Sequence, residues 1–200
     1  MKDIYYQISG EGFPIVFLHG NGEDHHIFDQ AVLQLSKQYQ CICIDSRYHG
    51  QSIHAGELSY QQMAKDVMGV VDELKLEAYD IIGFSDGAII ALLLAQCDLR
   101  LKHVVSIGAN TKPCYIKSFY RLTFYLQMLC LAVFALYQKK ARLTLKLYRL
   151  MLTQPQIEYQ QLHQIRIPVL VLAGEFDMIK EYGTKQIAKA LPYGIQKIIK

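Results

Sequence analysis

The segment 83–87 reads GFSDG and places a serine, Ser85, between two glycines. An apolar run typical of a strand precedes the serine, and an apolar run typical of a buried helix follows it. A serine on such a sharp strand-to-helix turn presents its hydroxyl to a cleft, and glycine neighbours are needed where strand and helix approach closely. The helix that begins after Ser85 would direct free N–H groups toward the same place. We therefore predict that Ser85 is a nucleophile in acyl transfer.

The segments around this turn alternate between strand-like and helix-like patterns. Short apolar runs rich in β-forming residues predict strands at 5–9, 15–18, 41–45, 79–84, 103–107, 169–173 and 196–200. Apolar residues at helical spacing predict helices at 28–38, 60–74, 88–95 and 184–191. Strands that alternate with helices are typical of a doubly wound, mostly parallel sheet, and fully apolar strands fit a sheet covered on both faces. The sequence therefore predicts an α/β fold.

One segment interrupts this alternation and carries the positive charge of the chain. Residues 99–157 contain ten Lys and Arg and no Asp or Glu, whereas the net charge of the whole chain is only +3. Such a shift in composition is typical of a separate structural unit. We therefore predict a helical cap at residues 111–159, inserted into a core made of residues 1–110 and 160–200.

Within this segment, residues 118–137 form an apolar run that is long enough to span a bilayer. The run lies between two core strands and a span would divide the sheet, so we expect no transmembrane segment. Residues 141–152 are amphipathic, with Arg142, Lys146 and Arg149 on one face and leucines on another. A cap that covers the edge of the sheet explains both helices. Contact of its basic side with a membrane surface or an anionic ligand is the alternative.

Four segments, each at the end of a predicted strand, resemble the α/β-hydrolase family in their order along the chain. They are HGNG at 19–22, DSRYHGQS at 45–52, GFSDG at 83–87 and LAGEFD at 172–177. In the second segment Tyr48 replaces a usual glycine. The resemblance covers nearly the whole chain. It implies an α/β-hydrolase fold with an inserted helical cap, and an esterase-like serine hydrolase that uses neither a metal nor an organic cofactor.

The resemblance also implies roles at the site. Asp177 corresponds to the acid that orients a histidine and stabilises its cation, and Glu175 is the less suitable neighbour. The backbone N–H groups of Asn21 and Asp86 correspond to the donors of an oxyanion hole, which contribute roughly 3–4 kcal/mol each. The implied substrate is a small molecule with an ester-like bond, and the aromatic residues of the cap favour an apolar acyl or ring group.

In this family the histidine that completes the triad follows the last strand, but no histidine follows His163. Four histidines are expected in loops at the correct edge of the sheet: His25, His26, His49 and His54. None is expected to meet Asp177 as well as Ser85, and a substitute base among these four is the alternative. We therefore expect a C-terminally shortened hydrolase or a non-catalytic relative that binds a small ligand, with weak or absent hydrolysis. A short C-terminus is also expected to leave the sheet edge near Ile198–Ile199 uncovered, which favours a homodimer.

Three further patterns bear on compartment and partners. Five cysteines, an odd number with no C-x-x-C pair, indicate thiols in a reducing compartment, and no signal peptide is visible, so we expect a cytoplasmic protein. The segment HGNGEDHH at 19–26 has adjacent histidines without a third ligand at regular spacing, which argues against zinc. The basic residues lie among leucines rather than on an aromatic platform, which argues against nucleic-acid binding.

Overall fold

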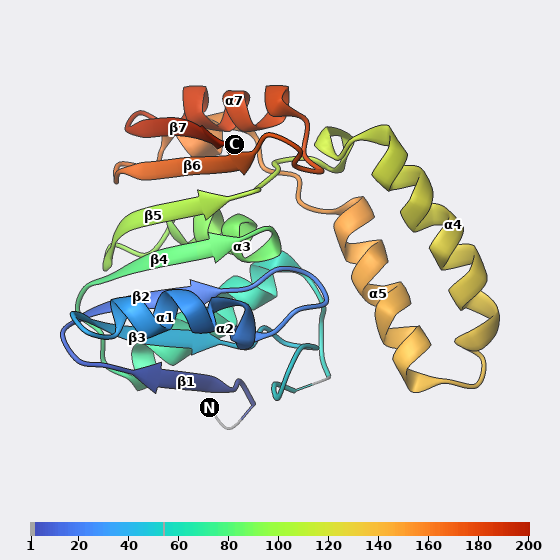
Figure 1. The fold of residues 1–200 in the computed structure, drawn as a ribbon, viewed down its shortest axis with the longest axis horizontal. Coiled ribbons are helices and arrows are strands. Elements are labelled where there is room, and N and C mark those ends of the chain that lie inside the picture. The colour runs from blue at the N-terminus through green and yellow to red at the C-terminus, as the bar shows by residue number, and fades with distance from the viewer. Residues whose placement is uncertain (1–2, 54) are drawn as a thin grey trace.

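A computed structural model describes residues 3–53 and 55–200, and its centre is a seven-stranded sheet (Figure 1). The strand order is β1-β3-β2-β4-β5-β6-β7, in which β1 runs antiparallel to β3 and every other neighbouring pair is parallel. The strands are β1 (Tyr6–Ser9), β2 (Phe13–Leu18), β3 (Tyr39–Ile44), β4 (Tyr79–Phe84), β5 (Leu101–Ile107), β6 (Val169–Gly174) and β7 (Gly194–Ile199). The predicted mostly parallel sheet is confirmed.

Helices cover both faces of this sheet, and a helical hairpin lies at its edge. They are η1 (His25–Phe28), α1 (Asp29–Leu35), α2 (Tyr60–Glu73), α3 (Asp86–Leu94), η2 (Pro113–Tyr115), α4 (Ser118–Phe134), α5 (Lys139–Thr153), α6 (Tyr159–His163) and α7 (Glu181–Ala190). Successive residues of a strand point to opposite faces, so Phe17 of β2 packs in the cluster beside η1 and α1. Its neighbours Val16 and Leu18 pack in the larger cluster with α2, α3, α6 and α7.

The face that carries α1 is only partly covered by the described residues. Along one row of paired residues on this face, Phe17 is fully buried, Ile82 and Leu170 are half-buried, and Ile195 of β7 is 66% exposed. Among the described residues, β7 is the outer strand of the sheet on this side. Self-association through this edge stays a prediction.

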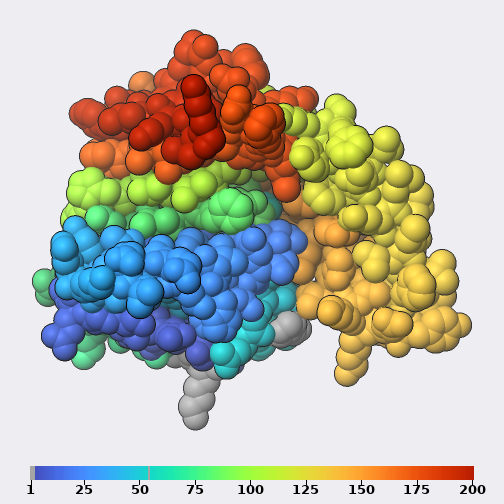
Figure 2. Space-filling view, in the orientation of Figure 1, coloured from blue at the N-terminus to red at the C-terminus, as the bar shows by residue number. Residues whose placement is uncertain are grey.

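The basic segment forms a helical hairpin at the edge toward which the parallel strands point (Figure 1). Its two helices, α4 and α5, pack against each other. No side chain of α4 is buried, whereas α5 buries Ala141, Leu147, Leu150 and Met151. Figure 2 shows the hairpin, in yellow and orange, at one side of the molecule. Among the described residues, no helix combines the length and apolar character that crossing a membrane requires. The division into a core and a cap at residues 111–159 stays a prediction.

Candidate active site

Ser85 lies on the turn between β4 and α3, at the carboxyl edge of the sheet. Its φ of 51° falls in the left-handed region, which residues other than glycine rarely adopt. Two sets of backbone hydrogen bonds hold this conformation. The N–H of Ser85 donates to the carbonyl of Ile107 (2.7 Å), and its carbonyl accepts from the N–H groups of Ala88 and Ile89. Strain held in this way is characteristic of functional sites, and the role of Ser85 as a nucleophile stays a prediction.

The loop after β2 passes directly beside Ser85. A Cβ atom on Gly20 would lie 3.1 Å from the Cβ of Ser85, so a glycine allows this close approach of the backbone. The carboxylate of Glu23 closes the loop, because its Oε2 accepts from the N–H of Gly20 at 2.9 Å. On the other side of Ser85, the N–H of Asp86 is the first of α3 and has no acceptor within its helix. The segments predicted to supply oxyanion donors, at Asn21 and Asp86, therefore adjoin the serine.

The side chain of Asp86 connects these two segments. It is buried and accepts from the hydroxyl of Tyr60 at 2.8 Å and from the side-chain amide of Asn21 at 3.1 Å. The same amide also donates to the carbonyl of Leu147 in α5 at 3.4 Å. Burial raises the pKa of Asp86 to about 6, although both hydrogen bonds act in the opposite direction. Asp86 and Tyr60 are therefore positioning residues for the loop that carries Asn21, a role that the sequence analysis missed.

Replacing Asp86 by asparagine is expected to remove a pH dependence of stability. The pKa of Asp86 rises from its ordinary value of 3.8 to about 6 on folding. As the pH rises from about 4 to about 6, the unfolded chain therefore releases a proton that the folded chain retains. Over this rise the free energy of unfolding falls by about 3 kcal/mol. The asparagine variant lacks this fall, and urea denaturation of both proteins from pH 4 to pH 7 measures the difference.

Asp98 provides a matched control for this prediction. It is also buried, but hydrogen bonds from Arg100 outweigh the effect of burial and lower its pKa. Its contribution to stability is therefore present above the unfolded pKa and is lost as the pH falls. As the pH rises, the free energy of unfolding of the wild type is therefore expected to increase relative to that of Asp98→Asn. This is opposite to the change expected for Asp86→Asn. A constant difference between wild type and Asp86→Asn across this range would contradict the raised pKa.

Asp177 lies in the turn after β6 and approaches the end of β5. Its Oδ1 accepts from the N–H of Ile179 at 2.9 Å, which fixes the carboxylate. A Cβ atom on Gly108 would lie 3.3 Å from its Oδ2. Gly108 directly follows the residue whose carbonyl accepts from the N–H of Ser85. Asp177 and Ser85 therefore flank the same end of β5, whereas Glu175 is exposed.

Both ring nitrogens of His19 form hydrogen bonds with backbone groups of neighbouring loops. Its Nε2 accepts from the N–H of Ser46 at 3.0 Å, and its Nδ1 lies 2.8 Å from the carbonyl of Gly20, to which it donates in the tautomer that this pair of contacts requires. Burial lowers the pKa of His19, which favours the neutral ring. His19 therefore holds the Gly20 loop against the segment after β3.

The contacts of four other described histidines are with groups other than Ser85 and Asp177. The ring nitrogens lie 2.8 Å from Asp45 for His25, 3.1 Å from Asp29 for His26, 2.9 Å from Asp80 for His103 and 3.0 Å from the carbonyl of Arg47 for His49. His163 ends α6, and His54 lies outside the described residues. In these contacts no described histidine bridges Ser85 and Asp177.

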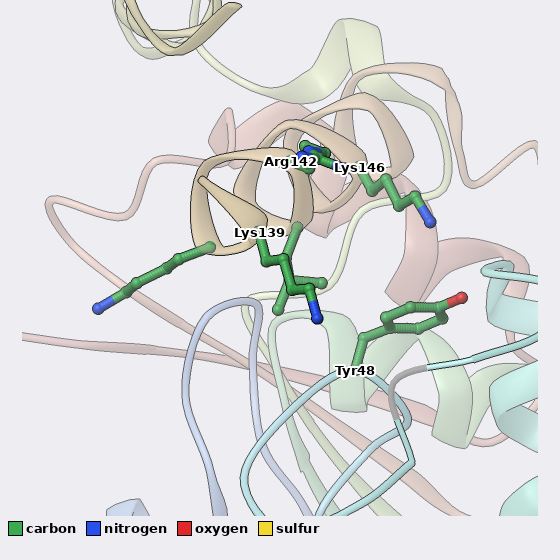
Figure 3. A pocket seen from close by; sticks show the side chains of 6 residues that line it. Tyr48, Lys139, Arg142 and Lys146 are labelled. Atoms are coloured by element: carbon green, nitrogen blue, oxygen red, sulfur yellow. The ribbon is translucent and has the colours of Figure 1, made fainter. Parts of the chain in front are cut away.

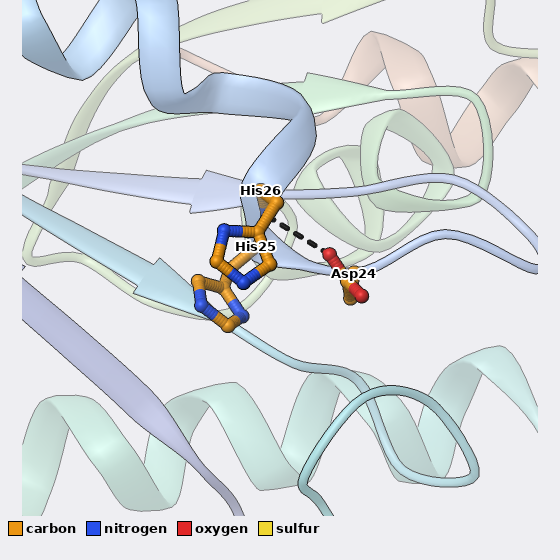
Figure 4. Close-up of side chains that lie close together, drawn as sticks. All are labelled: Asp24, His25 and His26. Carbon is orange, nitrogen blue, oxygen red and sulfur yellow. Dashed lines mark hydrogen bonds between the residues drawn. The ribbon is translucent and has the colours of Figure 1, made fainter.

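Asp24, His25 and His26 bring three potential ligand atoms within 4.8 Å of one another (Figure 4). Their hydrogen bonds give each of them a structural role. Asp24 accepts from the N–H of His26 at 3.0 Å and so caps η1, while His25 is buried against Asp45. Burial alone would raise the pKa of Asp45, but hydrogen bonds from Gln51 and His25 outweigh it and lower that pKa. The expectation of no metal at this segment stays a prediction.

Tyr48, where the family resemblance leads one to expect glycine, has a φ of 67°. Its side chain is used in two ways: the hydroxyl donates to the carbonyl of Gly56 at 2.7 Å, and the ammonium of Lys146 lies 5.4 Å from the ring centroid. Tyr48 therefore joins the loop after β3 to the hairpin. It borders a cavity of about 520 Å³ (Figure 3) whose other lining residues are Lys139, Lys140, Arg142, Leu143 and Lys146.

Comparison with known proteins places the chain in a family. The family model described as the alpha/beta hydrolase fold matches residues 14–129. Among curated relatives, 3-oxoadipate enol-lactonase 1 of Acinetobacter baylyi is 36% identical over 95 residues, which are 46% of this chain and 36% of that protein. The matched part thus spans only about a third of such a relative.

Solved structures agree in fold at low sequence identity. The enol-lactonase from Burkholderia xenovorans superposes with a TM-score of 0.77 at 20% identity, and an esterase from Exiguobacterium antarcticum with a TM-score of 0.80 at 19% identity. Each alignment covers 98% of this chain and 87% of the other. These structures share the fold, and the family model matches more than half of the chain. The chain therefore belongs to the α/β hydrolase fold family.

Proposed function

We propose that this protein is a serine hydrolase that transfers the acyl group of a carboxylic ester or lactone to water through Ser85. The observation that carries the proposal is the left-handed φ of Ser85 at a strand end, with the Gly20 loop against its side chain. Asp177 is the proposed acid, and the N–H groups of Asn21 and Asp86 are the proposed oxyanion donors. The similarity to a named enol-lactonase supports the ester-like bond.

The proposed reaction follows the acyl-transfer sequence of serine hydrolases. The Oγ of Ser85 bonds to the carbonyl carbon while a base takes its proton, and the carbonyl oxygen becomes an oxyanion that the two N–H groups stabilise. The bond to the leaving oxygen then breaks, and that oxygen takes the proton from the base. Water repeats the sequence on the acyl-serine and releases the acid. Each oxyanion donor is worth roughly 3–4 kcal/mol at the transition state.

In the histidine contacts described above, no ring bridges Ser85 and Asp177 as a base would. We therefore propose that these 200 residues, assayed alone, hydrolyse esters slowly, since a positioned general base contributes about 10²–10⁴ in rate. The five cysteines are all free thiols in the structure, which supports a reducing compartment such as the cytoplasm. An apolar small-molecule ester is the proposed substrate.

Covalent labelling tests the proposed nucleophile. A fluorophosphonate is expected to modify the chain at Ser85, identified by mass spectrometry of the digested protein, because the oxyanion donors also stabilise the phosphonyl adduct. The labelling is expected to be slow, since the serine proton must be lost without a positioned base. The variant Ser85→Ala is expected to lose the label, whereas Ser118→Ala, which removes an exposed hydroxyl on α4, keeps it. Equal labelling of wild type and Ser85→Ala would overturn the proposal.

A second candidate is a binding protein on the same fold that holds a small ligand without turnover. The observation that favours it is the absence, among the contacts of the described histidines, of a base between Ser85 and Asp177. This candidate predicts no covalent label at Ser85, while apolar esters still shift the thermal unfolding temperature of the chain. Labelling at Ser85 would decide against it.

A further inference from the structure

α4 presents an unusually apolar surface to solvent. Five large apolar residues recur at intervals of three and four, which places them on one side of the helix. Their exposed fractions are 71% for Phe119, 58% for Leu122, 53% for Leu126, 70% for Leu129 and 64% for Val133. We call these five residues the α4 stripe. Exposure of single apolar residues is ordinary, but a contiguous stripe of this kind marks a surface that binds something.

Positive charge lies beside the α4 stripe. Between α4 and α5 runs a groove of about 550 Å³ that Leu129 of the stripe and Tyr125 share with Lys146 and Arg149 of α5. Both cationic residues are exposed. No acidic residue occurs anywhere in residues 99–157, so nothing within the hairpin neutralises them. An apolar stripe with an adjoining cationic row is the pattern of a helix that lies in a membrane interface.

We propose that the α4–α5 hairpin docks on the surface of an anionic phospholipid bilayer. The α4 stripe enters the boundary between head groups and acyl chains, and Arg149 contacts the lipid phosphates. Lys146, whose exposed ammonium lies 5.4 Å from the ring of Tyr48, turns from that ring to the phosphates. α4 is about 25 Å long and lies in the plane of the membrane, in agreement with the finding that no described helix suits a membrane crossing. The hairpin projects at the side of the molecule (Figure 2), so a flat surface has access to it.

A second copy of the chain fits this surface less well than a lipid does. A two-fold dimer brings the same patch of both copies together, and here that patch belongs to a hairpin, residues 118–153, with six positive and no negative side chains. Like charges facing each other in an interface are unfavourable, whereas anionic lipids attract Lys and Arg with about 1 kcal/mol per residue. Charge complementarity therefore favours an anionic membrane over a second copy of the chain as the partner of this surface.

Vesicle co-sedimentation tests the proposal with the wild-type chain. We expect binding to vesicles of phosphatidylcholine mixed with phosphatidylglycerol, and much weaker binding to vesicles of phosphatidylcholine alone. The variant Leu126→Glu or Leu129→Glu is expected to reduce the affinity by about tenfold or more, because one large apolar residue leaves the acyl region. The double variant Lys146→Gln and Arg149→Gln is expected to bind the anionic vesicles about 30-fold more weakly, at about fivefold per charge.

Matched variants at distant exposed positions separate docking from general effects. Leu99→Glu changes a 91% exposed leucine between α3 and β5, and Lys185→Gln changes an exposed lysine of α7; both are expected to bind like wild type. Equal loss in these controls, or equal binding to neutral and anionic vesicles, would overturn the proposal. So would a dimer in sedimentation equilibrium that Leu129→Glu dissociates, without vesicle binding by the wild type. None of these readouts depends on hydrolysis by Ser85.

Discussion

Replacing Gly87 by alanine is expected to lower the free energy of unfolding by at least about 3 kcal/mol. A Cβ atom at this position would lie against the carbonyl carbon and oxygen of Leu18, closer than the 3.0 Å that such atoms keep. The obstacle is backbone of the central strand β2, which cannot rotate away as a side chain can. The variant therefore must move α3 off the sheet or deform the turn at Ser85, a cost at or above the upper range for overpacked cores.

Chemical denaturation of the two proteins measures this change, and Gly174→Ala provides the control. Gly174 also ends a strand, but a Cβ there would meet only the N–H nitrogen of Asp177, at 3.9 Å. Its replacement is expected to change the free energy of unfolding by less than about 0.5 kcal/mol. A Gly87→Ala variant as stable as Gly174→Ala would mean that α3 packs on β2 less closely than the structure indicates.

The strand-to-helix turn was predictable because its signal is local. The segment GFSDG itself contains the residues that allow the sharp turn, because Gly83 and Gly87 lie where α3 contacts the sheet. The sequence also shows that Tyr48 stands where the family usually has glycine. It does not show how this residue affects the structure. Only the fold shows that this residue keeps the left-handed φ that suits glycine. Its hydroxyl then gains a contact with Gly56, eight residues along the chain, and its ring a contact with Lys146 of the hairpin.

The network around Asp86 could not be predicted, since its partners Tyr60 and Asn21 come from other elements. The exposure of α4 was missed for a related reason. Helical spacing reveals that a helix has an apolar side, but not which surface that side meets. The sequence analysis assigned the aromatic residues of this segment to a ligand. In the structure Phe124 packs against Tyr148 of α5, whereas Phe119 and Phe134 are largely exposed.

Added imidazole is expected to increase ester hydrolysis by these 200 residues by about 10- to 100-fold, and the increase should saturate. A positioned base contributes about 10²–10⁴ in rate, and an untethered base that binds beside Ser85 recovers part of this. A cavity of about 480 Å³, lined by Gly174, Glu175 and Ile198, lies at the ends of β6 and β7, next to the turn that carries Asp177 but not bordered by Ser85. Initial rates at increasing imidazole concentration measure the effect.

Two variants decide whether such an increase passes through the proposed site. Ser85→Ala should show only the linear background rate of imidazole itself, because the nucleophile is absent. Asp177→Asn should retain the serine but lose most of the saturating increase, since no carboxylate then orients the ring and stabilises its cation. Asp177 already accepts a hydrogen bond from the N–H of Ile179, which an asparagine oxygen also accepts, so the turn is expected to keep its shape. A saturating increase of equal size in all three proteins would show that imidazole acts elsewhere, and the assignment of Ser85 and Asp177 to one catalytic unit would then be wrong.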